Sequence, residues 1–129
     1  MDRQGVDRPQ RILVVDDSAD MRDLWNLWLT AHGFSVIEAQ NGLEALEQVE
    51  LRLPDLVLLD VMMPVMDGLE TLKRLRALAP TSAVPVIMLS AQGEAGARQA
   101  RQFGPDLYLR KPVAPDDLMR HIRGLLRRG

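Results

Sequence analysis

The chain has 129 residues, a size typical of one domain, and a formal net charge of −2 at pH 7. The near balance of acids and bases gives no global field favouring nucleic acid or an anionic membrane, and the absence of cysteine excludes disulfides and thiolate metal sites. The polar N-terminus has no apolar signal core, and no apolar run approaches the roughly 20 residues of a membrane span. We therefore expect a cytoplasmic protein with a flexible tail over residues 1–10 and one domain over residues 11–128.

Five short apolar runs alternate along the chain with longer helical patterns. The first, third and fourth runs are almost continuously apolar, as expected of strands buried on both faces. Strands that alternate with helices indicate βαβ units and a parallel sheet. The pattern predicts a doubly wound α/β domain with five parallel strands and five helices, but it does not separate the two common strand orders. The strands are expected at residues 12–15, 34–39, 55–59, 84–89 and 106–109.

The ends of the expected helices carry recognisable signals. Gly33 stops the first helix, and Asn41 with Glu44 three residues later resembles a capping box at the start of the second. The fourth helix contains two glycines and little apolar content, so we expect it to be the least stable. The helices are expected at about residues 20–32, from about residue 41, after Asp67-Gly68 from about residue 69 to residue 80, at about 93–103, and from about 114–116.

Polar side chains follow four of the five expected strands. Asp16 and Asp17 follow the first, Asp60 the third, Ser90 the fourth and Lys111 the fifth. Ligands of open parallel sheets bind beyond the carboxyl ends of the strands, so we expect these side chains to meet in one shallow pocket. Taken singly, each has a simpler explanation as a turn residue, a helix cap or a solvated loop residue. Their combined order favours a functional site.

The chemistry of this residue set points to a cation and a phosphoryl group. Three neighbouring carboxylates repel one another, and a bound cation relieves the repulsion. Hard oxygen ligands without cysteine suit Mg²⁺. Lys111 adds a mobile positive charge suited to a phosphate or a carboxylate, and a carboxylate such as Asp60 can act as a nucleophile that forms an aspartyl phosphate. The sequence therefore predicts a Mg²⁺-assisted phosphoryl site around Asp60.

At this point the sequence resembles the receiver domain of two-component response regulators. The resemblance covers about residues 11–128, and its motifs are specific in their order and spacing rather than singly. It implies a flavodoxin-like fold in which the sheet has the order 2-1-3-4-5 and helices cover both faces. The matching motifs are Asp16-Asp17 after ILVV, Asp60 after LVLL, MMPVMDG (62–68), MLSA (88–91) and YLRKP (108–112).

The resemblance implies roles for the residues of the acidic site. Asp60 would be the phosphoacceptor, supplied by a histidine on a sensor histidine kinase or a histidine phosphotransfer protein. Mg²⁺ would be bound by Asp17, Asp60 and the backbone carbonyl of Met62, with Asp16 acting through a metal-bound water. Lys111 would pair with Asp60 at rest and with the phosphoryl oxygens afterwards.

The resemblance also implies a switch. Ser90 would donate its hydroxyl to the phosphoryl group, beside the backbone N–H groups of Ala91 and Met62. Tyr108 would turn inward when Ser90 moves, which would change the face formed by the fourth helix, the fifth strand and the fifth helix. The peptide bond before Pro112 is often cis in this family and would place the lysine. The downstream target is not specified, and neither nucleic-acid binding nor membrane binding by this chain is expected.

Two other functions are compatible with the same fold. A phosphatase that forms an aspartyl phosphate usually carries a second acid two residues after the nucleophile, and Met62 in that position argues against it. A non-phosphorylated interaction module would lack an acid or the lysine, and none is missing here.

The first expected helix carries Trp25 and Trp28, which form an apolar stripe with Met21, Leu24 and His32. Packing in the core is the favoured explanation of this stripe. A docking surface for the phosphodonor, a use that receiver domains often make of this helix, is the alternative.

Overall fold

The computed structural model describes residues 9–61, 66–79, 81–90, 98, 101 and 104–128. All five expected strands are present in these ranges, and four of the five expected helices. The fourth expected helix, over residues 93–103, lies almost entirely outside the described residues. In chain order the elements are β1 (Arg11–Val15), α1 (Ala19–Ala31), β2 (Ser35–Ala39), α2 (Gly42–Leu51), β3 (Leu56–Asp60), α3 (Gly68–Ala77), the 3-10 helix η1 (Thr81–Ala83), β4 (Val86–Ser90), β5 (Leu107–Arg110) and α5 (Pro115–Arg128).

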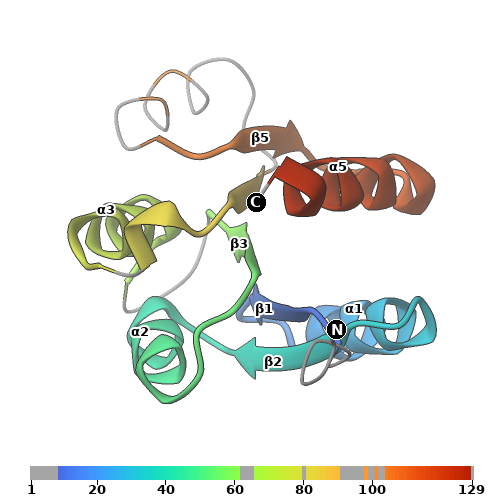
Figure 1. Cartoon of the computed structure of the whole chain (residues 1–129), viewed down its shortest axis with the longest axis horizontal. Coiled ribbons are helices and arrows are strands. Elements are labelled where there is room, and N and C mark those ends of the chain that lie inside the picture. Colours follow the sequence, from blue (N-terminus) through green and yellow to red (C-terminus); the bar gives the residue numbers. More distant parts are fainter. Residues whose placement is uncertain are drawn as a thin grey trace.

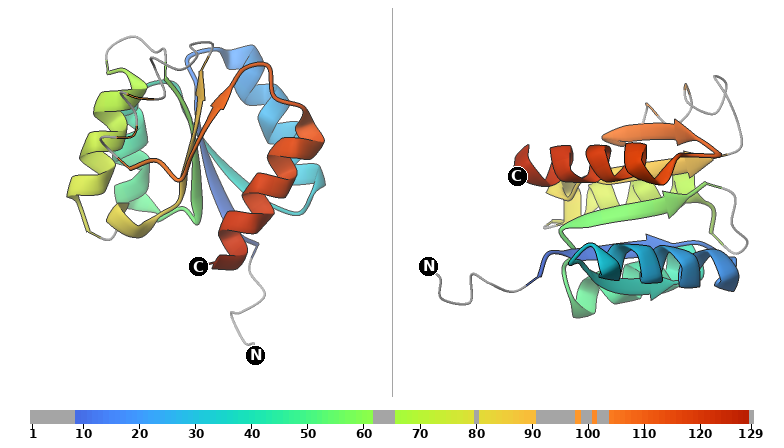
Figure 2. Two further views of the ribbon diagram at one scale, coloured as in Figure 1. Left: turned by 90° about the horizontal axis from the view of Figure 1, so that it is seen from above. Right: turned by 90° about the vertical axis from the view of Figure 1, so that its right-hand side faces the viewer.

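The five strands form one parallel sheet of order β2-β1-β3-β4-β5 (Figure 1). This order confirms the one implied by the family resemblance. Helices α1 and α5 cover one face of the sheet, and α2 and α3 cover the other (Figure 2, left). No helix within the described ranges is long and apolar enough to cross a lipid bilayer.

The alternation of side chains along the strands divides the core into two layers. On β3, Val57 and Leu59 pack with residues of α2 and α3, whereas Leu56 and Leu58 pack with residues of α1 and α5. Every residue of β3 and β4 is buried, as expected of central strands covered on both faces. The same alternation determines toward which face of the sheet the side chain at the end of a strand points.

Side-chain caps fix the starts of three helices. Ser18 accepts a hydrogen bond from the Met21 amide at 3.2 Å, and Asp67 caps α3 in the same way. Asn41 accepts from the Glu44 amide at 2.8 Å, as the capping-box pattern predicts. The Glu44 carboxylate accepts from the amide of residue 40, one residue before the cap, at 3.1 Å. The predicted stop of α1 is also confirmed, since Gly33 has a φ of 93°.

The apolar stripe expected on α1 is only partly correct. Trp25 and Leu29 are buried against the sheet, and Trp28 is half-buried. Leu24 is 55% exposed, and His32 is exposed as well, so neither belongs to the core. The face directed at the sheet is centred on Trp25 and Leu29, and Leu24 is turned about 100° away from Trp25 on the helix.

Candidate functional site

The carboxyl ends of β1, β3 and β5 bring the predicted site residues to one edge of the sheet. Asp16 follows β1, and its amide still donates to a β2 carbonyl, that of Ala39, at 3.1 Å. Asp60 ends β3, next to β1 in the sheet, and Val15 pairs with the residue before Asp60. By strand alternation Asp16, Asp60 and Lys111 all belong to the face covered by α1 and α5. Asp16, Asp60 and Lys111 converge because the parallel strands end at the same edge of the sheet and their side chains point to the same face.

The structure brings three carboxylates together at this edge. One oxygen of each of Asp16, Asp17 and Asp60 lies within 4.8 Å of the oxygens of the other two. Asp16 and Asp60 are buried, with exposures of 4% and 7%, whereas Asp17 is exposed and forms the open side of the group. Three hard oxygen donors that share a mostly buried position fit a Mg²⁺ ion that keeps several waters on its open side.

Lys111 supplies the positive charge beside Asp60. Its Nζ atom lies 3.4 Å from Asp60 Oδ1, and its side chain is 33% exposed. The backbone places it, because the Lys111 amide donates to the Ser90 carbonyl at 2.7 Å. The Lys111–Pro112 peptide bond is cis, as the resemblance implies. The backbone of Lys111 is therefore tied to the end of β4 by one short hydrogen bond, while its ammonium group reaches Asp60.

The two residues predicted to form the switch lie on the opposite face of the sheet. Ser90 ends β4 and is fully buried, and Tyr108 on β5 is half-buried against the core layer of α2 and α3. Tyr108 pairs with Met88, two residues before Ser90. Ser90 and Tyr108 therefore lie on neighbouring, hydrogen-bonded strands of the sheet. Met62 and Ala91, the predicted backbone contacts of the phosphoryl group, lie outside the described residues.

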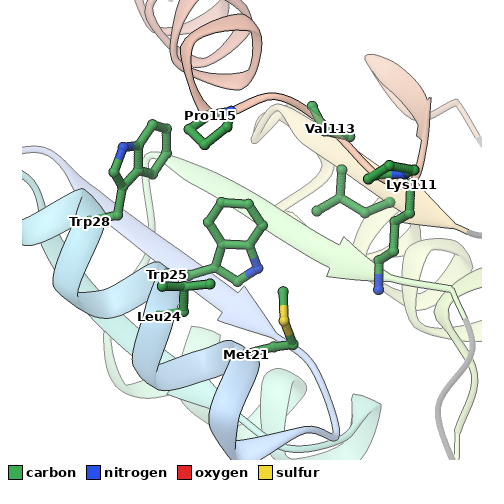
Figure 3. Close-up of a pocket in the computed structure, with 9 residues that line it drawn as sticks. Met21, Leu24, Trp25, Trp28, Lys111, Val113 and Pro115 are labelled. Atoms are coloured by element: carbon green, nitrogen blue, oxygen red, sulfur yellow. The ribbon is translucent and has the colours of Figure 1, made fainter.

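A largely apolar groove of about 510 Å³ lies beside the acidic site, between α1 and the start of α5. Figure 3 shows Lys111 at one end of the groove and Trp28 at the other. Trp25 and Trp28 make an edge-to-face contact, with ring centroids 5.7 Å apart. The groove is on the same face of the sheet as Asp60 and is continuous with Lys111. Its lining includes Met21, Leu24, Trp25, Trp28, Val113 and Pro115.

Comparison with known families decides the class of this domain. The family described as response regulator receiver domain matches residues 12–123. The chain belongs to this family. Receiver domains are signalling modules of two-component systems rather than enzymes, and the Asp16, Asp17 and Asp60 triad is typical of their Mg²⁺ site.

Relatives and solved structures agree with this assignment. Response regulator MprA from Mycobacterium sp. (strain KMS) is 43% identical over 121 residues, which are 93% of this chain and 52% of that protein. Phosphate regulon transcriptional regulatory protein PhoB from Klebsiella pneumoniae is 39% identical over 120 residues, covering 92% of this chain and 52% of that protein. The receiver domain thus spans about half the length of these curated relatives.

Two solved structures have the same fold. Chemotaxis protein CheY4 from Vibrio cholerae superposes with a TM-score of 0.86 at 29% identity, covering 91% of this chain and 98% of that one. A CheY-like response regulator receiver domain protein from Methanospirillum hungatei JF-1 also gives a TM-score of 0.86, at 30% identity, covering 93% of this chain and 95% of that one.

Two residues that support the receiver site were not identified from the sequence. Gly68 begins α3 directly against the end of β3, where an added Cβ would lie 2.6 Å from the Asp60 carbonyl oxygen. Its amide donates to the Val61 carbonyl at 2.9 Å. Arg22 on α1 donates to the Asp16 carbonyl at 2.7 Å. A glycine at the first position of an otherwise regular helix was the available signal for Gly68, whereas no local pattern points to Arg22.

Proposed function

We propose that this receiver domain is the phosphoacceptor of a two-component or phosphorelay system. Asp60 would take a phosphoryl group from a phosphohistidine on a sensor histidine kinase or a histidine phosphotransfer protein, in the cytoplasm, where the lack of cysteine is compatible with a reducing environment. The observation that carries the proposal is the group of three carboxylates within 4.8 Å of one another, with Lys111 3.4 Å from Asp60, in a member of the receiver family.

The residues of the site have complementary tasks in the transfer. An Asp60 carboxylate oxygen attacks the phosphorus atom, the bond from phosphorus to the histidine nitrogen breaks, and the imidazole keeps the electron pair and takes up a proton. Asp17, Asp60 and the Met62 carbonyl would hold Mg²⁺, with Asp16 acting through water. When bound, the ion would neutralise charge on the carboxylates and the transferring phosphoryl oxygens. Lys111 would leave its Asp60 partner and pair with a phosphoryl oxygen.

The new charge on Asp60 would drive the switch. A phosphoryl group adds nearly two negative charges and needs donors that the resting carboxylate did not need. The Ser90 hydroxyl and the backbone N–H groups of Met62 and Ala91 would provide them, and Tyr108 would turn inward as Ser90 moves. The face that includes β5 and α5 would then favour the conformation bound by a downstream protein or output domain.

Incubation with acetyl phosphate and Mg²⁺ tests the proposed function. We expect the intact mass to increase by one phosphoryl group, because the donor is activated and the nucleophile is preplaced. EDTA should abolish the gain, and hydroxylamine should remove it, since it cleaves acyl phosphates. No mass gain from a protein that binds Mg²⁺ would favour the non-phosphorylated interaction module. Sustained release of phosphate from a phosphomonoester would favour the phosphatase.

The apolar groove between α1 and α5 supports a place for the phosphodonor. A protein that delivers a phosphoryl group to Asp60 must come close to Lys111, and the groove extends from Lys111 along α1. Leu24 at its rim and Leu27 on the same helix are 55% and 72% exposed, so they add apolar surface next to the groove. We therefore assign the groove to an apolar side chain of the phosphodonor.

Leu24→Ser tests this docking surface. We expect phosphorylation by acetyl phosphate to keep its wild-type rate, because the site is intact. Transfer from an autophosphorylated histidine kinase that phosphorylates the wild type should slow by roughly tenfold, the effect of losing a buried apolar contact of about 1.4 kcal/mol. Leu43→Ser, on α2 and 47% exposed, is the matched control and should transfer normally. Equal rates for both variants would exclude docking at this groove.

A further inference from the structure

Arg22 connects the acidic site to the edge strand of the sheet. It lies in the second turn of α1, and its Nη1 atom donates to the backbone carbonyl of Asp16 at 2.7 Å. Its Nε atom lies 3.3 Å from Oε1 of Glu38 on β2, and the two side chains are only 16% and 32% exposed. The guanidinium group therefore bridges a loop carbonyl and a carboxylate from another element.

Glu38 is itself held in place. Its second oxygen, Oε2, accepts a hydrogen bond from Asn26 Nδ2 at 2.7 Å. The Asn26 side-chain oxygen accepts from the Thr30 hydroxyl at 3.0 Å. Both carboxylate oxygens of Glu38 are thus engaged, one by Arg22 and one by Asn26. Because Glu38 has two fixed partners, it holds Arg22 in a defined orientation. Arg22, Glu38 and Asn26 together form a brace that connects α1 and β2 to the loop after β1.

The brace ends at the peptide group that joins Asp16 to Asp17. Because a peptide group is planar, a hydrogen bond to its carbonyl fixes the direction in which the chain enters Asp17. Asp16 has two further restraints: its amide donates to the Ala39 carbonyl at 3.1 Å, and its Oδ1 atom accepts from the Ser18 amide at 2.9 Å. Arg22 therefore completes the restraint of the segment that supplies two of the three carboxylates.

We propose that Arg22 is a positioning residue for the cation site, which sets the placement of Asp16 and Asp17 through the Asp16 carbonyl and is anchored by Glu38. The inference rests on the proposed Mg²⁺-dependent function. Groups that orient metal ligands commonly change metal affinity by 10- to 100-fold when they are removed.

A simpler role for Arg22 is to neutralise the charge of the three carboxylates, and this role predicts the opposite change in Mg²⁺ affinity. If Arg22 only neutralised the acids, it would compete with Mg²⁺, and its removal would strengthen Mg²⁺ binding. Two observations favour positioning. The charge of Arg22 is paired with Glu38, outside the triad, and its hydrogen bond to Asp16 is made to the carbonyl rather than to the carboxylate.

The sign of the change in Mg²⁺ affinity tests the proposal. Mg²⁺ is titrated into the full chain and followed by the NMR signal of the Ser18 amide, which donates to Asp16. Arg22→Met should raise the Kd by roughly tenfold or more. The charge-matched double variant Arg22→Met/Glu38→Gln should do the same. The increase should persist from low to high salt, because a lost geometric restraint is not screened as a charge effect is. The Ser18 amide should also exchange faster with solvent in both variants without Mg²⁺.

The controls separate this inference from the proposed function. Arg120→Met removes one positive charge from the exposed Arg120–Asp117 ion pair of α5 and should leave the Kd unchanged. Should Arg22→Met fail to fold, Arg22→Gln takes its place, since its shorter side chain cannot reach both partners. An unchanged or lower Kd in the Arg22 variants, with normal binding by the wild type, overturns the positioning role alone. Failure of the wild type to bind Mg²⁺ overturns the proposed function as well.

Discussion

Asp60→Asn should abolish phosphorylation by acetyl phosphate, leaving the intact mass unchanged under conditions that fully modify the wild type. Asparagine has nearly the shape of aspartate, so the buried end of β3 should keep its packing. Its amide is a far weaker nucleophile than a carboxylate, and it cannot form a stable acyl phosphate. The loss should therefore be complete, and mass spectrometry of the intact protein after incubation with donor and Mg²⁺ measures it directly.

The matched control is Asp20→Asn, which removes one carboxylate from the exposed first turn of α1. This variant should gain one phosphoryl group at the wild-type rate, because Asp20 is not a member of the triad. A mass gain that survives in Asp60→Asn would identify a different acceptor. Peptide mapping would then show whether Asp17, the exposed member of the triad, carries the phosphoryl group.

Gly68→Ala should destabilise the protein by about 1–3 kcal/mol, although alanine is the better helix former by roughly 1 kcal/mol. The added Cβ would lie 2.6 Å from the Asp60 carbonyl oxygen and 2.7 Å from Val61 Cα. Both are backbone atoms and cannot turn aside, so the start of α3 must move away from β3. That movement would stretch the 2.9 Å hydrogen bond from the Gly68 amide to the Val61 carbonyl and displace Asp60. Urea denaturation measures the loss, and acetyl phosphate labelling should become slower.

Gly124→Ala provides the control for this steric argument. Gly124 lies inside α5, and an added Cβ there would meet nothing within 4 Å. Alanine should therefore stabilise the protein by about 0.5–1 kcal/mol, the usual gain at an open helical position. Opposite signs for the two variants would support the close approach of α3 to β3. Stabilisation by both would show that α3 can begin elsewhere without cost.

The positions of the acidic residues could be predicted because each follows a strand with a strong apolar signal. The buried strands β1, β3 and β4 have continuous apolar runs, and the carboxyl ends of parallel strands share one edge. The strand order could not be obtained in this way, because two orders satisfy the same alternation of strands and helices. It followed only from the family resemblance, which the sheet topology confirms.

The sequence could not define how α1 is rotated about its own axis, and therefore which of its residues face the sheet. Apolar residues occupy a wide arc of this helix, so the pattern was compatible with Leu24 and His32 in the core, where the structure does not place them. The contribution of Arg22 could not be predicted either, because it depends on the fold bringing its side chain to the backbone carbonyl of Asp16. The contribution of Gly68 depends in the same way on its contact with the backbone of Asp60, and a glycine at the start of a helix was its sequence signal. The predicted roles of Met62, Ala91 and the fourth helix fall outside the described residues and stay predictions.

Strand parity has a consequence for how such a domain could diversify. Asp60 and Lys111 share their side of the sheet with α1 and α5, whereas Ser90 and Tyr108 share theirs with α2 and α3. Substitutions on the exposed surface of α1 could therefore change which upstream partner the domain accepts, without altering the packing around Tyr108 on the other face. After a gene duplication, two copies could in this way come to accept different kinases while both keep the same Ser90 and Tyr108 face.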